Sequence, residues 1–72
     1  MTTLAGTKIR RFREERSLTR ATFGAWFDIP GSTVQGWEKD GKRASAKVAN
    51  LIAAHGIASH ADWNVTVRDA EN

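Results

Sequence analysis

The sequence predicts an all-α domain of four to five short helices. Apolar residues recur at the three- and four-residue spacing that places side chains on one helical face. Three of these stretches follow a hydroxyl residue that favours a helix N-terminus: Thr19, Ser45 and Ser59. Pro30 and Gly56 stand where neighbouring helices would separate. We therefore expect one helical domain over residues 1–64 and a tail over residues 65–72.

The chain is small and must be stabilised by apolar packing. Its 72 residues suit one domain with a modest core, which is only marginally stable on its own. There is no cysteine, and His55 and His60 lack acidic neighbours at ligand spacing, so we expect no disulfide, metal or cofactor. Self-association would then help to stabilise the domain.

No segment is typical of a membrane-spanning or secreted protein. No apolar run approaches the ~20 residues of a membrane span. The N-terminal residues lack the basic-then-apolar order of a signal peptide. We therefore expect a cytoplasmic protein without membrane partners.

Positive charge is concentrated in the first two thirds of the chain. Residues 1–47 hold ten Lys or Arg against five Asp or Glu, whereas residues 48–72 hold one against three. A basic region of this kind favours a polyanionic partner such as nucleic acid. A solvated surface that happens to be basic is the alternative.

The first helix is expected to begin at Leu4, after frayed residues 1–3, and to end near Arg16 and Ser17. Its apolar face is formed by Ala5, Ile9 and Phe12. Lys8, Arg10, Arg11 and Glu14 lie on its other faces.

The next helix is expected over residues 20–27, with Thr19 as its N-cap. Phe23 and Phe27 are four residues apart and share a face. The sequence Asp28-Ile29-Pro30 then forms a three-residue turn, because proline disfavours helix in the residue before it and aspartate tolerates left-handed geometry.

A helix over residues 31–39 follows, opened by the proline. Val34 and Trp37 lie three apart and can both face the core. The side chains expected to face away from the core are Ser32, Thr33 and Gln35, together with the backbone of Gly36.

The remaining residues are expected to form a fourth helix after Ser45, a short fifth helix after Ser59, and an extended tail. The inward residues of the fourth helix are Val48, Leu51 and Ile52. The fifth would contain residues 60–63, and residues 65–67 could form a short strand or an arm.

Two short helices joined by a tight turn and flanked by positive charge are typical of DNA-binding proteins. The major groove of DNA is wide enough to admit one helix. A helix in that groove needs small or amide-bearing residues near its N-terminus. The sequence supplies five: Gly31, Ser32, Thr33, Gln35 and Gly36.

Two segments share a pattern with a known family. The first matches L-R-x-x-R-x-x-x-G-L-S-x-x-x-L-A at Ile9, Arg10, Arg13, Ser17, Leu18, Thr19, Phe23 and Gly24. The second matches S-T-V-x-x-W-E at Ser32, Thr33, Val34, Trp37 and Glu38. Residues 8–57 thus resemble the helix-turn-helix family of lambdoid phage repressors and Cro proteins, which also includes restriction–modification controllers and some antitoxins.

The resemblance implies a lambda-repressor-like domain in which the second and third helices form the helix-turn-helix. It implies that Gly24 lets those two helices approach closely, and that Arg13 and Glu38 form an ion pair. It also places Phe23, Val34 and Trp37 in the core. Several residues depart from the family: Asp28 replaces the turn glycine, Pro30 replaces Ser or Thr, and Arg20 replaces a phosphate-binding Gln.

The expected DNA contacts fall into two groups. Gln35 is the best base reader, because an amide can pair with both groups on the edge of adenine; the alternative is an ordinary exposed glutamine. Ser32 and Thr33 could contact bases or phosphates, or only cap the helix. Residues expected near phosphates, or else only solvated, are Thr19, Arg20, Lys39, Lys42, Arg43 and Lys47.

Tryptophans provide the remaining expectations. Trp26 lies where the family is variable and polar, so we expect it at the surface. Trp63 could close the core, or it could contact a second copy together with Val65 and Val67.

We find no catalytic arrangement and expect a protein that is not an enzyme. The favoured function is a Cro- or controller-type transcriptional regulator, acting as a repressor that binds a double-stranded operator as a homodimer, with RNA polymerase as a further possible partner. The alternatives are a protein-interaction module, such as a phage-encoded inhibitor or antirepressor, and an antitoxin that holds both a toxin and an operator.

Overall fold

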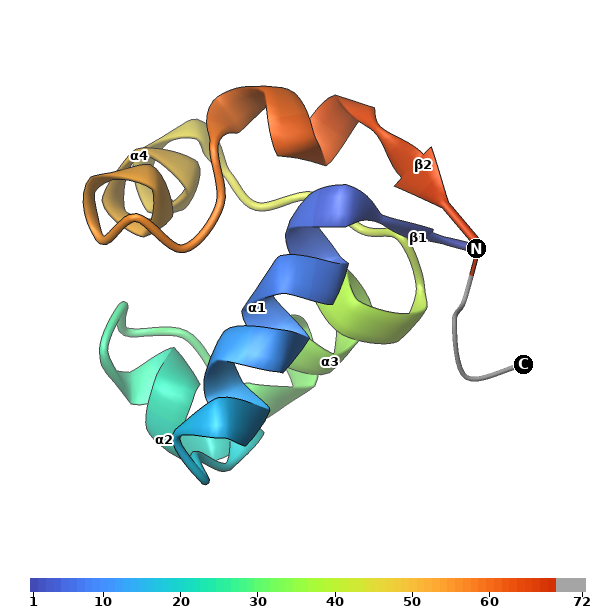
Figure 1. Ribbon diagram of the computed structural model, residues 1–72. Helices are drawn as coiled ribbons and strands as arrows, with labels where there is room; N and C mark the ends of the chain where they lie inside the picture. Colours follow the sequence, from blue (N-terminus) through green and yellow to red (C-terminus); the bar gives the residue numbers. More distant parts are fainter. Residues whose placement is uncertain (69–72) are drawn as a thin grey trace.

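The computed structural model describes residues 1–68 and is mostly helical, as predicted (Figure 1). Its elements in chain order are β1 (Thr2–Thr3), α1 (Leu4–Glu15), α2 (Arg20–Ala25), α3 (Gly31–Lys39), α4 (Ala46–Ala54), the 3-10 helix η1 (His60–Asn64) and β2 (Thr66–Val67). Figure 1 shows α1 across the centre of the molecule. α3 lies behind α1, and α4 lies at the upper left of the view. None of these helices is long and apolar enough to cross a membrane.

Hydroxyl side chains cap the helices where the sequence predicts them. Thr19 Oγ1 accepts a hydrogen bond from the Thr22 amide at 3.0 Å, and Ser45 Oγ accepts from the Val48 amide at 3.4 Å. At η1 the Asp62 carboxylate accepts from the Ser59 amide at 2.9 Å. Each bond satisfies an amide that has no partner within its own helix.

The connection between α2 and α3 is longer than predicted. Because α2 ends at Ala25, five residues (26–30) rather than three join the two helices. The Ile29 amide donates to the Gly24 carbonyl at 2.9 Å, which reverses the chain. Asp28 has a positive φ of 58°, so the left-handed geometry expected of this aspartate is confirmed.

The core lies among all four helices and η1. Its buried apolar residues are Ala5, Ile9, Phe23, Phe27, Val34, Trp37, Ala49, Ile52, Ile57, Ala58 and Trp63. The prediction that Leu51 faces inward is wrong, since 40% of it is exposed. α4 meets the core through Ala49 and Ile52, and Leu51 lies about 100° around the helix from Ile52.

The two ends of the described chain pair with each other. β1 and β2 form an antiparallel sheet with Thr2 opposite Val67 and Thr3 opposite Thr66. Thr2 and Thr3 are buried, so the prediction that residues 1–3 are frayed is wrong. The sequence pattern missed this sheet because its partners are more than sixty residues apart. The predicted short strand near residues 65–67 is confirmed, and residues 69–72 of the tail lie outside the described residues.

Trp63 closes the core, which is one of the two alternatives that the sequence left open for this side chain. Only 5% of it is exposed, and its ring packs edge-on against Trp37 at a centroid distance of 5.7 Å. The other alternative, in which the Trp63 side chain contacts a second copy of the protein, is therefore wrong. Val65 is 43% exposed and Val67 is half-buried, so part of the tail remains at the surface.

Candidate nucleic-acid interface

The outer face of α3 carries the polar side chains that the sequence singles out. Ser32, Thr33 and Gln35 are exposed, whereas Val34 and Trp37 are buried on the inner face. The helical period separates these two sets, because residues three or four apart share a face. The first turns of α3 therefore present two hydroxyls and one amide to solvent.

The two glycines of α3 lie elsewhere than predicted. A Cβ at Gly31 would lie 3.0 Å from the Ala21 amide nitrogen, so this residue faces α2. Gly36 is buried, and a Cβ there would lie 3.1 Å from the side chain of Lys42. The assignment of both to the base-reading face is therefore corrected: Gly31 lies against the backbone of α2, and Gly36 lies beneath the side chain of Lys42.

The segment after α3 folds back along the helix. The amides of Asp40 and Lys42 both donate to the Gly36 carbonyl, at 2.9 and 3.2 Å. Lys42 and Arg43 are exposed and share a hollow with Ser32 and Thr33 from the start of α3. A hollow of about 300 Å³ is lined by Ser32, Thr33, Trp37, Lys42 and Arg43. Two of the expected base readers, Ser32 and Thr33, thus share one surface with two of the expected phosphate contacts, Lys42 and Arg43.

The four other expected phosphate contacts do not line this hollow. Lys39 is exposed in the last turn of α3, and Lys47 is exposed on α4. Thr19 caps α2 through its hydroxyl, which also donates to Thr22 Oγ1 at 2.8 Å. Arg20 is only partly exposed, and its Nε donates to Glu38 Oε1 at 3.2 Å. This nitrogen is therefore already engaged within the protein.

Glu38 anchors α3 from its inner side. Its carboxylate is fully buried and accepts two hydrogen bonds from Arg13, Nε to Oε2 at 2.9 Å and Nη2 to Oε1 at 3.1 Å. The expected Arg13–Glu38 ion pair is confirmed. Arg13 Nη1 also donates to the Leu18 carbonyl at 2.9 Å.

This network joins α1, the start of α2 and the end of α3. The hydrogen bonds to Glu38 raise the pKa of Arg13 above its ordinary value, against the opposing effect of burial. A paired carboxylate in the interior fixes orientation more than it adds stability, because desolvation offsets much of the attraction. The outer face of α3 is therefore held in one direction relative to α2.

Gly24 and Gly6 set the distances between these elements. A Cβ at Gly24 would lie 2.3 Å from the Ile29 carbonyl oxygen, so this glycine accommodates the turn rather than the helix that follows it. A Cβ at Gly6 would lie 2.0 Å from the Trp37 carbonyl oxygen. Gly6 thus lets α1 lie directly against α3, a role that the sequence analysis missed. A glycine inside an apolar helical stretch was the available signal.

Comparison of the chain with protein-family models, curated proteins and solved structures finds no match.

Proposed function

We propose that this protein is a sequence-specific double-stranded DNA-binding regulator of transcription, with α2 and α3 as a helix-turn-helix of the phage repressor and Cro type. One observation supports this most strongly. The hydroxyls of Ser32 and Thr33 lie beside the cations of Lys42 and Arg43, and the amide of Gln35 is exposed one turn further along α3 from Ser32. Base edges are read by hydroxyl and amide side chains, and phosphates are bound by cations.

The dimensions of α3 suit the major groove. Nine residues give a helix about 13 Å long, enough to follow a few base pairs along a groove that is ≈ 12 Å wide. Gln35 would pair with the edge of an adenine, and Ser32 and Thr33 would contact bases or phosphates beside it. Lys39, Lys42 and Arg43 would flank the helix at the phosphate backbone.

The proposed regulator acts as a repressor and binds as a homodimer in the cytoplasm. Dimeric helix-turn-helix proteins bind two half-sites one helical turn apart, so that the symmetry of the operator matches that of the protein. The exposed Val65, next to β2, remains the proposed contact with the second copy.

A titration of ¹⁵N-labelled protein with a mixed-sequence DNA duplex tests the proposed surface. Non-specific binding at low salt is electrostatic and uses the same basic face as specific binding. We expect amide shifts to concentrate at residues 31–36 and 41–43. Shifts confined to the outer face of α1, or no shifts at low salt, would contradict the proposal.

A further inference from the structure

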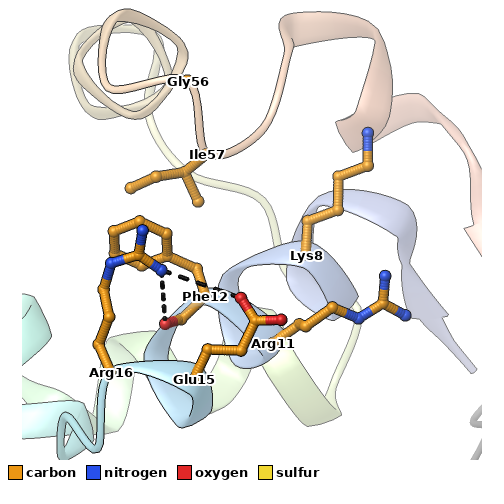
Figure 2. Close-up of a pocket in the computed structure, with 7 residues that line it drawn as sticks. All are labelled: Lys8, Arg11, Phe12, Glu15, Arg16, Gly56 and Ile57. Atoms are coloured by element: carbon orange, nitrogen blue, oxygen red, sulfur yellow. Dashed lines mark hydrogen bonds and ion pairs between the residues drawn. The ribbon is translucent and has the colours of Figure 1, made fainter.

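A second surface lies on the opposite side of α1 from the candidate nucleic-acid interface. Gly6 and Arg13 face α3, as their contacts with Trp37 and Glu38 show. Lys8 and Arg11 lie about half a turn further around α1. There they border a groove of about 240 Å³ between α1 and the turn after α4 (Figure 2).

Two of the seven residues that line the groove, Phe12 and Ile57, are apolar. Figure 2 shows the side chains of Phe12 and Ile57 next to each other, with the Arg16 guanidinium over the Phe12 ring. Ile57 belongs to the core and is only 7% exposed. Trp26 extends this apolar surface, because it is 47% exposed and its ring lies 5.9 Å from that of Phe12. His55 borders the same patch, with its ring 6.3 Å from that of Trp26. An exposed tryptophan beside a hollow is typical of a protein-binding site.

The rim of the groove is mainly cationic. The Arg16 guanidinium lies 3.8 Å over the Phe12 ring, and its Nη1 donates to the Phe12 carbonyl at 3.4 Å. Arg11 is exposed and forms no ion pair with any residue of the described range 1–68. Glu15 lies 3.9 Å from Arg16, and Lys8 is paired with Asp62 at 2.9 Å. Arg11 is thus a cation still available to a partner.

The size and charge of the groove distinguish between possible occupants. Its volume is below the ≈ 300–1,000 Å³ of most small-molecule sites and suits one protein side chain. Duplex DNA fits the groove less well, because Glu15 lies on the rim and the Phe12 and Ile57 side chains have no hydrogen-bond donor for phosphates. An acidic protein segment with one bulky apolar side chain matches both the walls and the rim.

We propose that this groove is a docking site for an acidic segment of another protein, which packs an apolar side chain against Phe12 and the exposed Trp26 and places carboxylates against Arg11 and Arg16. The site lies away from α3, so a partner could be held while the nucleic-acid face is occupied. The proposal does not depend on DNA binding, since its residues contribute nothing to the α3 surface.

Two labelled peptides provide the test. One has the sequence Asp-Glu-Asp-Leu-Asp-Glu-Asp, and the other has serine in place of leucine. We expect the leucine peptide to shift the amides of Phe12, Arg16, Gly56 and Ile57 in the ¹⁵N-labelled protein. The serine peptide should bind at least about tenfold more weakly, because a buried leucine side chain contributes ≈ 1.5–3 kcal/mol.

Two charge reversals on opposite faces serve as matched variants. Arg11→Glu should weaken the leucine peptide about fivefold, whereas Arg43→Glu should leave its affinity unchanged. Both residues are exposed, so neither change threatens folding.

Four results would overturn the proposal. The first two are equal affinity of the two peptides for the protein and an equal loss of affinity in the two variants. The other two are amide shifts centred on Lys42 and Arg43, and no amide shifts at millimolar peptide. DNA-induced shifts at Phe12 and Ile57 would likewise assign the groove to the nucleic-acid surface. The peptide titration contains no DNA, so its failure is distinct from failure of the proposed regulator function.

Discussion

At the scale of single residues, Glu38 links the stability of the domain to the orientation of its candidate DNA-contacting helix. Its buried carboxylate binds Arg13 from α1 and Arg20 from α2. Both arginines would lose their partner if the charge were removed. An unpaired charge in the interior lowers the stability of the folded protein. Substitution of Glu38 should therefore destabilise the domain more than substitution of a residue in an exposed ion pair.

Glu38→Gln is expected to lower the free energy of unfolding by about 3 kcal/mol or more. The amide retains the shape of the side chain but leaves Arg13, which is only 12% exposed, without a counter-charge. Urea denaturation provides the measurement. Glu14→Gln, at an exposed carboxylate that pairs with Arg10, is the control and should change stability by less than about 0.5 kcal/mol. Similar effects of the two substitutions would contradict the assigned role of Glu38.

Gln35 and Arg43 are expected to differ in what their loss does to binding. Gln35→Ala should relax the choice of base at one position and weaken the preferred site by about 1–3 kcal/mol. Arg43→Ala should weaken all sequences alike and flatten the salt dependence. Competition assays with preferred and mismatched duplexes separate these effects. Unchanged discrimination by Gln35→Ala would remove this residue from the base-reading set.

At the scale of elements, α3 is positioned by glycines as much as by its apolar face. Gly6 lets α1 reach the Trp37 carbonyl, and Gly31 lets α2 reach the start of α3. Each glycine within a helix costs about 1 kcal/mol relative to alanine. In the folded protein, Gly6 and Gly31 allow close contact between the backbones of neighbouring elements.

Gly6→Ala is expected to destabilise the protein by about 1–3 kcal/mol, although helix propensity alone predicts a gain. The new Cβ would lie 2.0 Å from the Trp37 carbonyl oxygen, so α1 and α3 would have to separate. Gly36→Ala is the matched control, because its Cβ would meet only the flexible Lys42 stem, and stability should hold or rise. Thermal denaturation distinguishes them; a stabilised Gly6→Ala would disprove the close contact.

The sequence predicts the existence and caps of the helices well but not how they meet. Thr19 and Ser45 signal helix starts through local hydrogen bonds, which depend only on nearby residues. The outward position of Leu51 depends on which face of α4 meets the core, and periodicity leaves two faces available. Likewise, Gly36 looks like part of an outer face until Lys42 folds over it.

The same distinction applies to the candidate site. Ser32, Thr33 and Gln35 follow from the helical period, and Arg13–Glu38 follows from the family resemblance. The end of α3 at Asp40-Gly41 could be foreseen, because Gly41 adopts the positive φ of 69° that favours glycine after a helix. The position of Lys42 and Arg43 beside Ser32 and Thr33 could not, because it depends on the path of the chain after that glycine.

At the scale of the whole molecule, the two ends of the described chain are fastened together. β1 pairs with β2, and Lys8 of α1 reaches Asp62 of η1 across 54 residues of sequence. Trp63 beside Asp62 then completes the core against Trp37. In so small a domain, a few such contacts are a large share of the total stability.

The contact between Lys8 of α1 and Asp62 of η1 should depend on pH. The Lys8 hydrogen bond, followed by that of the Ser59 amide, holds the pKa of Asp62 below its ordinary value of 3.8. A carboxylate whose pKa is lowered by folding stabilises the protein above the ordinary value, and loses this effect as pH falls through the folded-state pKa.

Asp62→Asn should therefore be less stable than the native protein near neutral pH, by about 1–3 kcal/mol. The difference should shrink as pH falls below about 3.8. Denaturation of both proteins across the acid range gives the comparison. A difference that stays constant through this range would show that charge plays no part in the contact.

Selection of binding sites from a randomised DNA duplex pool, near physiological salt, tests the central proposal most directly. A dimer that inserts α3 into successive major grooves should select a pseudo-palindrome with half-sites about ten base pairs apart. Failure to enrich any motif, or retention that vanishes with a modest increase in salt, would contradict a sequence-specific regulator.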